Sequence, residues 1–153
     1  MLYPIRLIVI GRPKLDAVRQ LESHYRDLLR AFCRLEVLEV PEGKGEGPRQ
    51  LKDEADRLKV LLAAVRCPVL LDAEGPSRSS EGMAAWLGVR MDRGESLAFA
   101  LGSSHGFDPA LKRAFPERLS LSPMTFPHDL SRVMFLEQLY RSFTILRGKT
   151  YHK

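Results

Sequence analysis

The chain has few cysteines and no long hydrophobic run. Its 153 residues include only two cysteines, Cys33 and Cys67, which are too few and too far apart for a zinc knuckle or a disulfide framework. We therefore expect a reduced, cytoplasmic protein without a metal site. No apolar stretch approaches the roughly 18 residues that a membrane-spanning helix needs, and so we expect no membrane partner.

The N-terminal segment also lacks the features of a signal peptide. The apolar run Ile5–Ile10 comes directly before Gly11, without a basic leader or a small-residue cleavage site. A β-branched run that ends at a glycine is typical of a strand buried on both faces. We expect the first strand here rather than a targeting segment.

Acidic residues are outnumbered by basic ones. The chain has 19 Asp and Glu against 24 Lys and Arg, which gives a net charge of +5, and 17 of the basic residues are arginine. Arginine suits bidentate contacts with phosphate, so a polyanionic partner is plausible. From Asp129 to Lys153 five basic residues face two acidic ones, which places much of the surplus at the C-terminal end.

Apolar periodicity predicts strands that alternate with helices. We expect strands at 5–10, 35–40, 68–72, 96–101 and 118–122, and helices at 14–32, 50–65 and about 79–91, with a short helix after Asp108 and a terminal helix after Pro127. Neither an internal repeat nor a second domain is evident. This order predicts one α/β domain, residues 1–153, with a five-stranded, mainly parallel sheet.

Three loops follow predicted strands and contain glycine, proline or carboxylates. They are Leu71–Gly75, Gly102–Gly106 (the glycine loop) and Leu121–Phe126 (the proline turn). Ligands of open α/β sheets bind outside the carboxyl ends of the strands, so these loops are candidate ligand walls. Asp72 and Glu74 are equally compatible with helix capping or turn chemistry, and the glycine loop is compatible with a plain tight turn.

The glycine-rich segment 42–48 lacks the spacing of a phosphate-binding loop. Its three glycines and mixed charges favour a mobile surface linker, with contact to an RNA backbone as the alternative.

The terminal helix has two apolar faces. The broad face holds Phe135, Leu136, Leu139, Tyr140, Phe143 and Leu146, and a smaller patch holds Met134 and Ile145. A monomer core and a dimer interface both satisfy this pattern. Arg132 lies on the broad face, where an unpaired charge is costly, and this favours a functional role for it.

Three motifs together resemble the RlmH family of SPOUT-class RNA methyltransferases, from the first strand to the last residue. They are Thr125–His128, the helix pattern Arg132-Val133, Glu137-Gln138, Tyr140-Arg141, and the terminal Tyr151-His152-Lys153. Members of this family methylate ring nitrogen 3 of a pseudouridine in bacterial large-subunit (23S) rRNA. The resemblance implies a C-terminal trefoil knot, a homodimer, S-adenosyl-L-methionine as cofactor and the assembled ribosome as partner.

The resemblance also implies site residues. The cofactor would contact Leu71, Gly102, Leu121, Ser122, Pro123, Met124, Thr125 and Phe126. His152 would accept or relay the imide proton, and Tyr151 would stack on the base. Arg132 would be the third catalytic residue. RNA phosphates would contact Arg141, Arg147, Lys149 and Lys153.

One departure from the family pattern stands in the glycine loop. The family often has Gly-Gly-x-x-Gly, but Ser103 occupies the second position here, where a positive φ would strain a serine. We therefore consider weakened cofactor binding, and as an alternative function a ribosome-binding assembly factor without methyl transfer. A transfer RNA methyltransferase is a further alternative, disfavoured because no added RNA-binding domain is evident.

Overall fold

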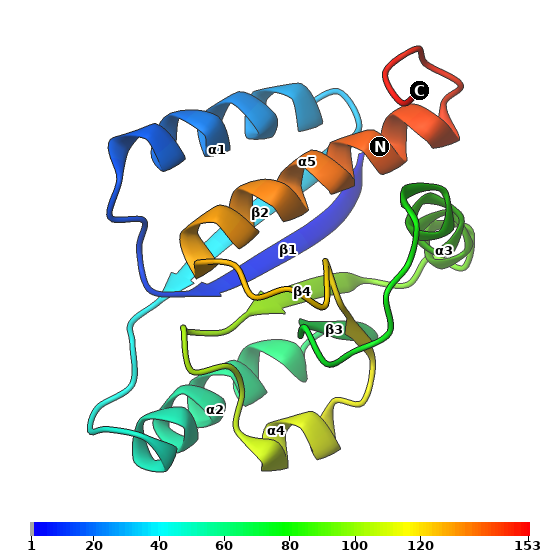
Figure 1. Cartoon of the computed structure of the whole chain (residues 1–153). Coiled ribbons are helices and arrows are strands. Elements are labelled where there is room, and N and C mark those ends of the chain that lie inside the picture. The colour runs from blue at the N-terminus through cyan, green and yellow to red at the C-terminus, as the bar shows by residue number, and fades with distance from the viewer. Residues whose placement is uncertain (1) are drawn as a thin grey trace.

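The protein contains a five-stranded sheet in which every paired strand is parallel (Figure 1). The structure is a computed structural model that describes residues 2–153. The strands are β1 (Tyr3–Ile10), β2 (Cys33–Val40), β3 (Cys67–Leu71), β4 (Leu97–Leu101) and β5 (Arg118–Leu119), in the order β2-β1-β4-β3-β5. The predicted α/β class and parallel sheet are confirmed.

Five helices cover the two faces of this sheet. They are α1 (Asp16–Leu29), α2 (Pro48–Leu62), α3 (Ser80–Asp92), α4 (Pro109–Ala114) and α5 (His128–Leu146). Alternate side chains of β1 explain the two layers, because Leu7 and Val9 pack with α1, α3 and α5, whereas Ile8 and Ile10 pack with α2 and α4. The strands are therefore buried on both sides, as their continuous apolar runs predict.

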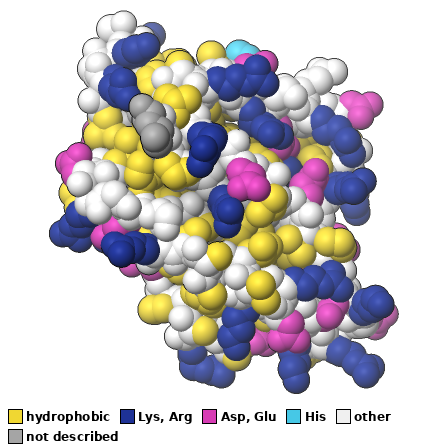
Figure 2. All heavy atoms as spheres, turned by 180° about the vertical axis from the view of Figure 1, so that it is seen from behind, with side chains coloured by type: hydrophobic (Ala, Val, Ile, Leu, Met, Phe, Trp, Pro, Cys, Tyr) yellow, Lys and Arg dark blue, Asp and Glu magenta, His cyan; other side chains and the backbone are white. Residues whose placement is uncertain are grey.

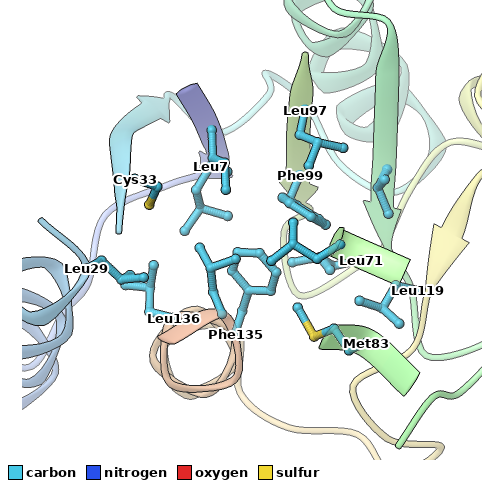
Figure 3. Packing of buried hydrophobic residues seen from close by; sticks show 14 of the residues in the cluster. Leu7, Leu29, Cys33, Leu71, Met83, Leu97, Phe99, Leu119, Phe135 and Leu136 are labelled. Carbon is cyan, nitrogen blue, oxygen red and sulfur yellow. The ribbon is translucent and has the colours of Figure 1, made fainter. Parts of the chain in front are cut away.

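Helix α5 supplies the centre of the larger core cluster. Phe135 and Leu136 point from α5 toward Leu7 and Phe99 of the sheet (Figure 3), and the rings of Phe99 and Phe135 lie 4.7 Å apart. Leu139 and Phe143 are equally buried. Burying one such side chain contributes about 1.5–3 kcal/mol. Most of the broad apolar face of α5 thus packs on the chain's own sheet, whereas Leu146 at its end is 40% exposed.

Two positions on α5 that the helical pattern marks as polar are fully buried. Ser142 donates a hydrogen bond to the carbonyl of Gln138 (2.8 Å), and Thr144 donates to the carbonyl of Arg141 (2.7 Å). Hydroxyls can return to their own helix in this way. Their burial therefore leaves no polar group unpaired.

Two helices begin at side-chain caps. Ser79 accepts a hydrogen bond from the amide of Gly82, and Asp108 accepts one from the amide of Ala110. These contacts fix the starts of α3 and α4, where the sequence predicts helices. Strand β5 ends at Leu119 rather than residue 122. Beyond it, the Ser120 amide bonds to the carbonyl of Pro76 (2.9 Å), and Ser120 pairs with Ser77 in an isolated bridge.

The segment between β2 and α2 is fastened at several points. The amide of Gly43 donates to Glu54 (3.0 Å), and the amide of Lys44 donates to Asp53 (2.8 Å). Arg57 also donates to the carbonyls of Pro41 and Glu42. The expectation of a mobile linker at 42–48 is therefore not supported.

Both cysteines are free and buried. Burial raises the pKa of Cys33 to about 12 and also raises the pKa of Cys67.

Over residues 2–153, no helix is both long enough and apolar enough to cross a bilayer.

Candidate active site

A cavity of about 180 Å³ lies at the carboxyl ends of β3 and β4. Its walls come from the end of β3, the glycine loop, the proline turn and the first turn of α5. Seven of the eight residues expected to contact a cofactor line it together: Leu71, Gly102, Leu121, Ser122, Met124, Thr125 and Phe126. Pro123 lies in the same turn, is exposed and is not part of the lining.

The glycine loop folds back closely on itself. A side chain on Gly102 would place its Cβ 2.7 Å from the carbonyl oxygen of Gly106, which explains why glycine is needed there. The amide of Gly106 donates to the carbonyl of Ser103 (2.9 Å). Among residues 2–153 only glycines have a positive φ, so Ser103 is unstrained and the expected backbone penalty is absent.

A charged cluster closes the cavity beside β3. Asp72 accepts contacts from Lys112 (2.9 Å) and Arg118 (3.4 Å), and its Oδ1 accepts from the amide of Glu74 (3.1 Å). Burial alone would raise the pKa of Asp72, but these contacts outweigh it and hold the pKa below its ordinary value. Asp72 thus joins β3, β5 and α4.

The first turn of α5 forms the remaining wall. His128 lines the cavity and lies 3.2 Å from the Asp129 carboxylate, which also accepts from the amide of Lys14 (3.0 Å). The start of α5 is therefore attached to the segment after β1.

The C-terminal tail, residues 147–153, packs against α5 and α3. The hydroxyl of Tyr151 donates to Glu137 (3.2 Å), and Arg141 lies over the Tyr151 ring with its guanidinium carbon 4.8 Å from the centroid. Burial, together with the charge of Glu137, raises the pKa of Tyr151 to about 12. The phenol therefore stays protonated at neutral pH.

Both ring nitrogens of His152 have partners. Arg141 approaches Nδ1 (3.1 Å), and Nε2 lies 2.6 Å from Glu81 of α3. Arginine only donates, so Nδ1 must accept and the proton sits on Nε2, facing the carboxylate. The hydrogen bond with His152 lowers the pKa of Glu81. In this arrangement His152 has no free nitrogen with which to accept a proton.

The tail and the cavity lie at opposite ends of α5 (Figure 1). Helix α5 has 19 residues, which span roughly 28 Å at 1.5 Å per residue. The tail turns back along α5 only as far as Glu137, in the middle of the helix, so one chain keeps Tyr151 and His152 away from the cavity at the start of α5.

Arg132 lies in the second turn of α5 and does not line the cavity. Its side chain is 1% exposed and contacts Glu22 of α1 (3.0 Å) and Glu39 of β2 (3.5 Å). These carboxylates neutralise the charge that the sequence marks as costly. The contacts favour a positioning role at the start of α5, and a direct catalytic role for Arg132 stays a prediction.

The basic residues expected to contact RNA are at the far end of α5. Arg147 and Lys149 lie over the ring of Phe32, at 5.9 Å and 5.0 Å from its centroid. Lys153 is exposed, whereas Arg141 is bound to Glu137 and its pKa is raised by that hydrogen bond. Viewed from behind, lysine and arginine are spread widely over the surface (Figure 2), so charge alone does not single out the tail.

Comparison with known proteins identifies the family. A family model described as "Predicted SPOUT methyltransferase" matches residues 3–152. The chain belongs to this family. Similar relatives include two proteins named ribosomal RNA large subunit methyltransferase H. The one from Pelobacter propionicus is 37% identical over 150 residues, and the match covers 97% of this chain and 98% of the relative. The one from Koribacter versatilis is 38% identical over 149 residues, and the match covers 97% of each chain.

Solved structures agree on the fold of this SPOUT methyltransferase family member. A probable methyltransferase from Bordetella pertussis Tohama I superposes with a TM-score of 0.61 over 92% of this chain and 95% of that one, at 14% identity. A putative methylase family protein from Neisseria gonorrhoeae gives 0.55, covering 97% and 95%, at 11% identity. At these identities the likeness supports the fold alone.

A second hollow in this SPOUT protein was not predicted. It has a volume of about 570 Å³ and lies between α1, α3 and α5. We call it the helix groove. Its apolar lining includes Leu21, Met83, Val133 and Met134, and Glu137 and Gln138 lie at its polar side. Met134 belongs to the smaller apolar patch of α5.

Several acidic residues that shape the site were missed by sequence reasoning. Glu137 joins Arg141 and Tyr151, Glu81 contacts His152, and Glu54 contacts Ser103 in the glycine loop. Each contact except Glu137 with Arg141 joins residues distant in sequence. The i,i+4 spacing indicates the pair of Glu137 and Arg141, but a helix pattern does not show the distant partner of a carboxylate, so the sequence carries no signal for the other three contacts.

Proposed function

We propose that this chain transfers a methyl group from S-adenosyl-L-methionine to ring nitrogen 3 of a pseudouridine in bacterial large-subunit (23S) rRNA, acting on the assembled ribosome. Membership of the SPOUT methyltransferase family and the names of the relatives support methyl transfer to ribosomal RNA. The observation that carries the proposal is the meeting of three loops around one cavity at the carboxyl ends of β3 and β4.

The composition of that cavity suits the proposed cofactor. Leu71, Leu121 and Phe126 offer apolar surface for a flat base, while the hydroxyls of Ser122 and Thr125 and nearby backbone groups offer polar contacts. Gly102 permits close approach of backbone. We propose that these residues, with Pro123 and Met124 in the same turn, hold the donor.

The chemistry is a displacement at carbon. When bound, the donor would supply an electrophilic sulfonium methyl group for in-line attack by the ring nitrogen, in which an N–C bond would replace the C–S bond, the C–S electron pair would go to sulfur, and the imide proton would leave to a base. We propose His152 as that base or relay, Tyr151 as the stacking partner of the pseudouridine, and Arg141, Arg147, Lys149 and Lys153 as phosphate contacts.

This assignment requires the tail to leave its present contacts. His152 becomes a proton acceptor only after Nδ1 separates from Arg141, because Nε2 already carries the proton that faces Glu81. Because the tail of one chain reaches back only to the middle of α5 and not to the cavity, we propose a homodimer in which each tail completes the cavity of the other chain. The helix groove, with its exposed Leu21, is the surface that we assign to the second copy.

We also propose that the C-terminal segment is knotted, as the family resemblance implies. After β5 at one edge of the sheet, the proline turn lies at the ends of β3 and β4, and α5 begins beside Gly11, which follows β1. This path across the sheet is consistent with a threaded chain.

The assembly-factor alternative has lost its support. It rested on strain at Ser103, and Ser103 has no positive φ. We therefore retain methyl transfer as the function.

The test is transfer of labelled methyl from S-adenosylmethionine to assembled bacterial ribosomes, free large-subunit RNA and bulk transfer RNA, followed by nucleoside analysis. Label on a pseudouridine from ribosomes alone is the expected result. Label on transfer RNA would redirect the substrate assignment. No label anywhere, with ribosome binding intact, would revive the assembly factor.

A further inference from the structure

The side chain of Glu54 is a buried carboxylate without a basic partner. It lies on α2 and is 2% exposed, and within residues 2–153 no lysine, arginine or histidine forms an ion pair with it. Three neutral donors surround it instead: the amide of Gly43 (3.0 Å), the side chain of Gln50 (3.1 Å) and the hydroxyl of Ser103 (2.9 Å). A buried carboxylate requires such donors, because desolvation is costly.

These donors come from different segments. Gly43 precedes α2 and Gln50 is on α2 itself, whereas Ser103 belongs to the glycine loop, 49 positions away from Glu54. The Ser103 contact is therefore the one that joins the face covered by α2 to the cavity. This contact is made by the hydroxyl of Ser103, the residue that replaces the glycine common in the family.

Ser103 is held at two points. Its hydroxyl is fixed by Glu54, and its carbonyl accepts from the amide of Gly106 (2.9 Å). The residue is 8% exposed and also lines the cavity. A loop attached at both side chain and backbone keeps its amides and carbonyls in one orientation.

We propose that Glu54 and Ser103 form a positioning pair that fixes the glycine loop in its ligand-binding shape. The identification of the ligand as S-adenosylmethionine rests on the function proposed above, whereas the predicted effect on the shape of the glycine loop does not. Neither residue enters the chemistry. Ser103 stands where the family often has its second glycine, and its hydroxyl adds a hydrogen bond to Glu54 that glycine cannot make.

Three variants separate the hydrogen bond from charge and from general destabilisation. Ser103→Ala removes the donor and leaves one Glu54 oxygen without it. Glu54→Gln keeps the contact, because its amide donates to the Ser103 hydroxyl while its oxygen accepts from Gly43 and Gln50. Asp53→Asn is the matched control, since Asp53 is adjacent on α2 and binds the Lys44 amide but does not contact the glycine loop.

Two readouts are taken on the full chain. Hydrogen exchange of the Gly106 amide, with the Phe99 amide of β4 as internal reference, reports the loop without any ligand. Calorimetric titration with S-adenosylmethionine reports binding. Losing a hydrogen bond to a charged group predicts, for Ser103→Ala, about 10-fold faster exchange at Gly106 and a Kd about 10-fold higher. Glu54→Gln should stay near wild type, and Asp53→Asn should change neither readout.

Unchanged exchange at Gly106 in Ser103→Ala, or equal acceleration at Phe99, would overturn the positioning pair. Equal acceleration at Gly106 in Asp53→Asn would also overturn it. Wild-type protein that binds no S-adenosylmethionine would instead contradict the proposed function, and the exchange result would still decide the pair.

Discussion

At the scale of single residues, two largely buried charges are satisfied by partners from distant segments. Arg132 contacts Glu22, 110 positions away, and Asp72 contacts Arg118, 46 positions away. The sequence shows that a charge on the apolar face of a helix needs a partner, but it does not show which one. That is why the burial of Arg132 was foreseeable and its ion pairs were not.

Asp72→Asn should destabilise the protein at neutral pH by about 1–3 kcal/mol, because Lys112 and Arg118 lose a charged acceptor. The folded state lowers the pKa of Asp72, so its contribution is complete above the ordinary value of about 3.9. The contribution disappears as the pH falls through the lower folded-state value. Chemical denaturation at several pH values measures the difference.

The matched control for that change is Glu74→Gln. Glu74 also contacts Lys112 (3.2 Å), but its side chain is 79% exposed, and exposed ion pairs contribute little. A difference between wild type and Asp72→Asn that widened below about pH 3.9 would contradict the assignment.

Two arginines of α5 should respond differently to the same substitution. Arg132→Met leaves Glu22 buried without its main cation and should cost about 3–5 kcal/mol. Arg141→Met removes a more exposed pair and should cost about 1 kcal/mol or less, yet it should reduce methyl transfer because a proposed phosphate contact is lost. Unfolding and methyl transfer are measured on both. Full stability of Arg132→Met with lost activity would restore the catalytic role for Arg132.

At the scale of helices and strands, local chemistry predicted most of the fold. Helices begin after Ser79 and Asp108 as predicted, with these two side chains as caps, and Ile5–Ile10 forms a buried strand. These features depend on neighbours in sequence. Strand β5 and the fastened loop before α2 depend on contacts to Pro76 and Glu54, which no local pattern encodes.

The end of α5 depends on one glycine. Gly148 has φ +63°, and no atom lies within 4 Å of the position that a Cβ would occupy there, so a substitution meets conformational strain only. Gly148→Ala should cost about 1 kcal/mol and displace the tail, whereas Gly148→Asn should cost less because asparagine tolerates this region. Thermal unfolding and methyl transfer compare the two. Equal losses in both variants would indicate that backbone conformation is not the cause.

At the scale of the whole molecule, the residues that the sequence groups into one site are divided between two regions. Seven residues expected around the cofactor meet in one cavity, while Tyr151 and His152 lie beside the middle of α5 and contact Glu137 and Arg141. The motifs give identity and order along the chain. The distance between the motifs follows from the length and direction of α5. The sequence of one chain does not show where a partner chain would lie.

Complementation between two inactive variants tests the proposed dimer. One variant carries Gly102→Ala in the cavity and the other lacks residues 151–153. If each tail serves the other chain, re-equilibrated equal mixtures should recover about a quarter of wild-type activity, since half the dimers are mixed and each has one intact site.

Each variant alone should be inactive, and the tail-deleted variant should still bind S-adenosylmethionine. Light scattering of both, and of Leu21→Glu in the helix groove, reports the dimer. No recovery in a mixture shown to exchange chains would assign each tail to its own cavity.

Because both native thiols are buried, a fluorescent dye can be attached to the tail alone. Only a thiolate reacts with maleimide dyes, and the pKa of Cys33 is raised to about 12 by burial, with Cys67 also raised. The natural sequence therefore serves as an unreactive background. A cysteine introduced by Lys153→Cys would label selectively, and its fluorescence would report when the tail changes surroundings as ribosomes bind.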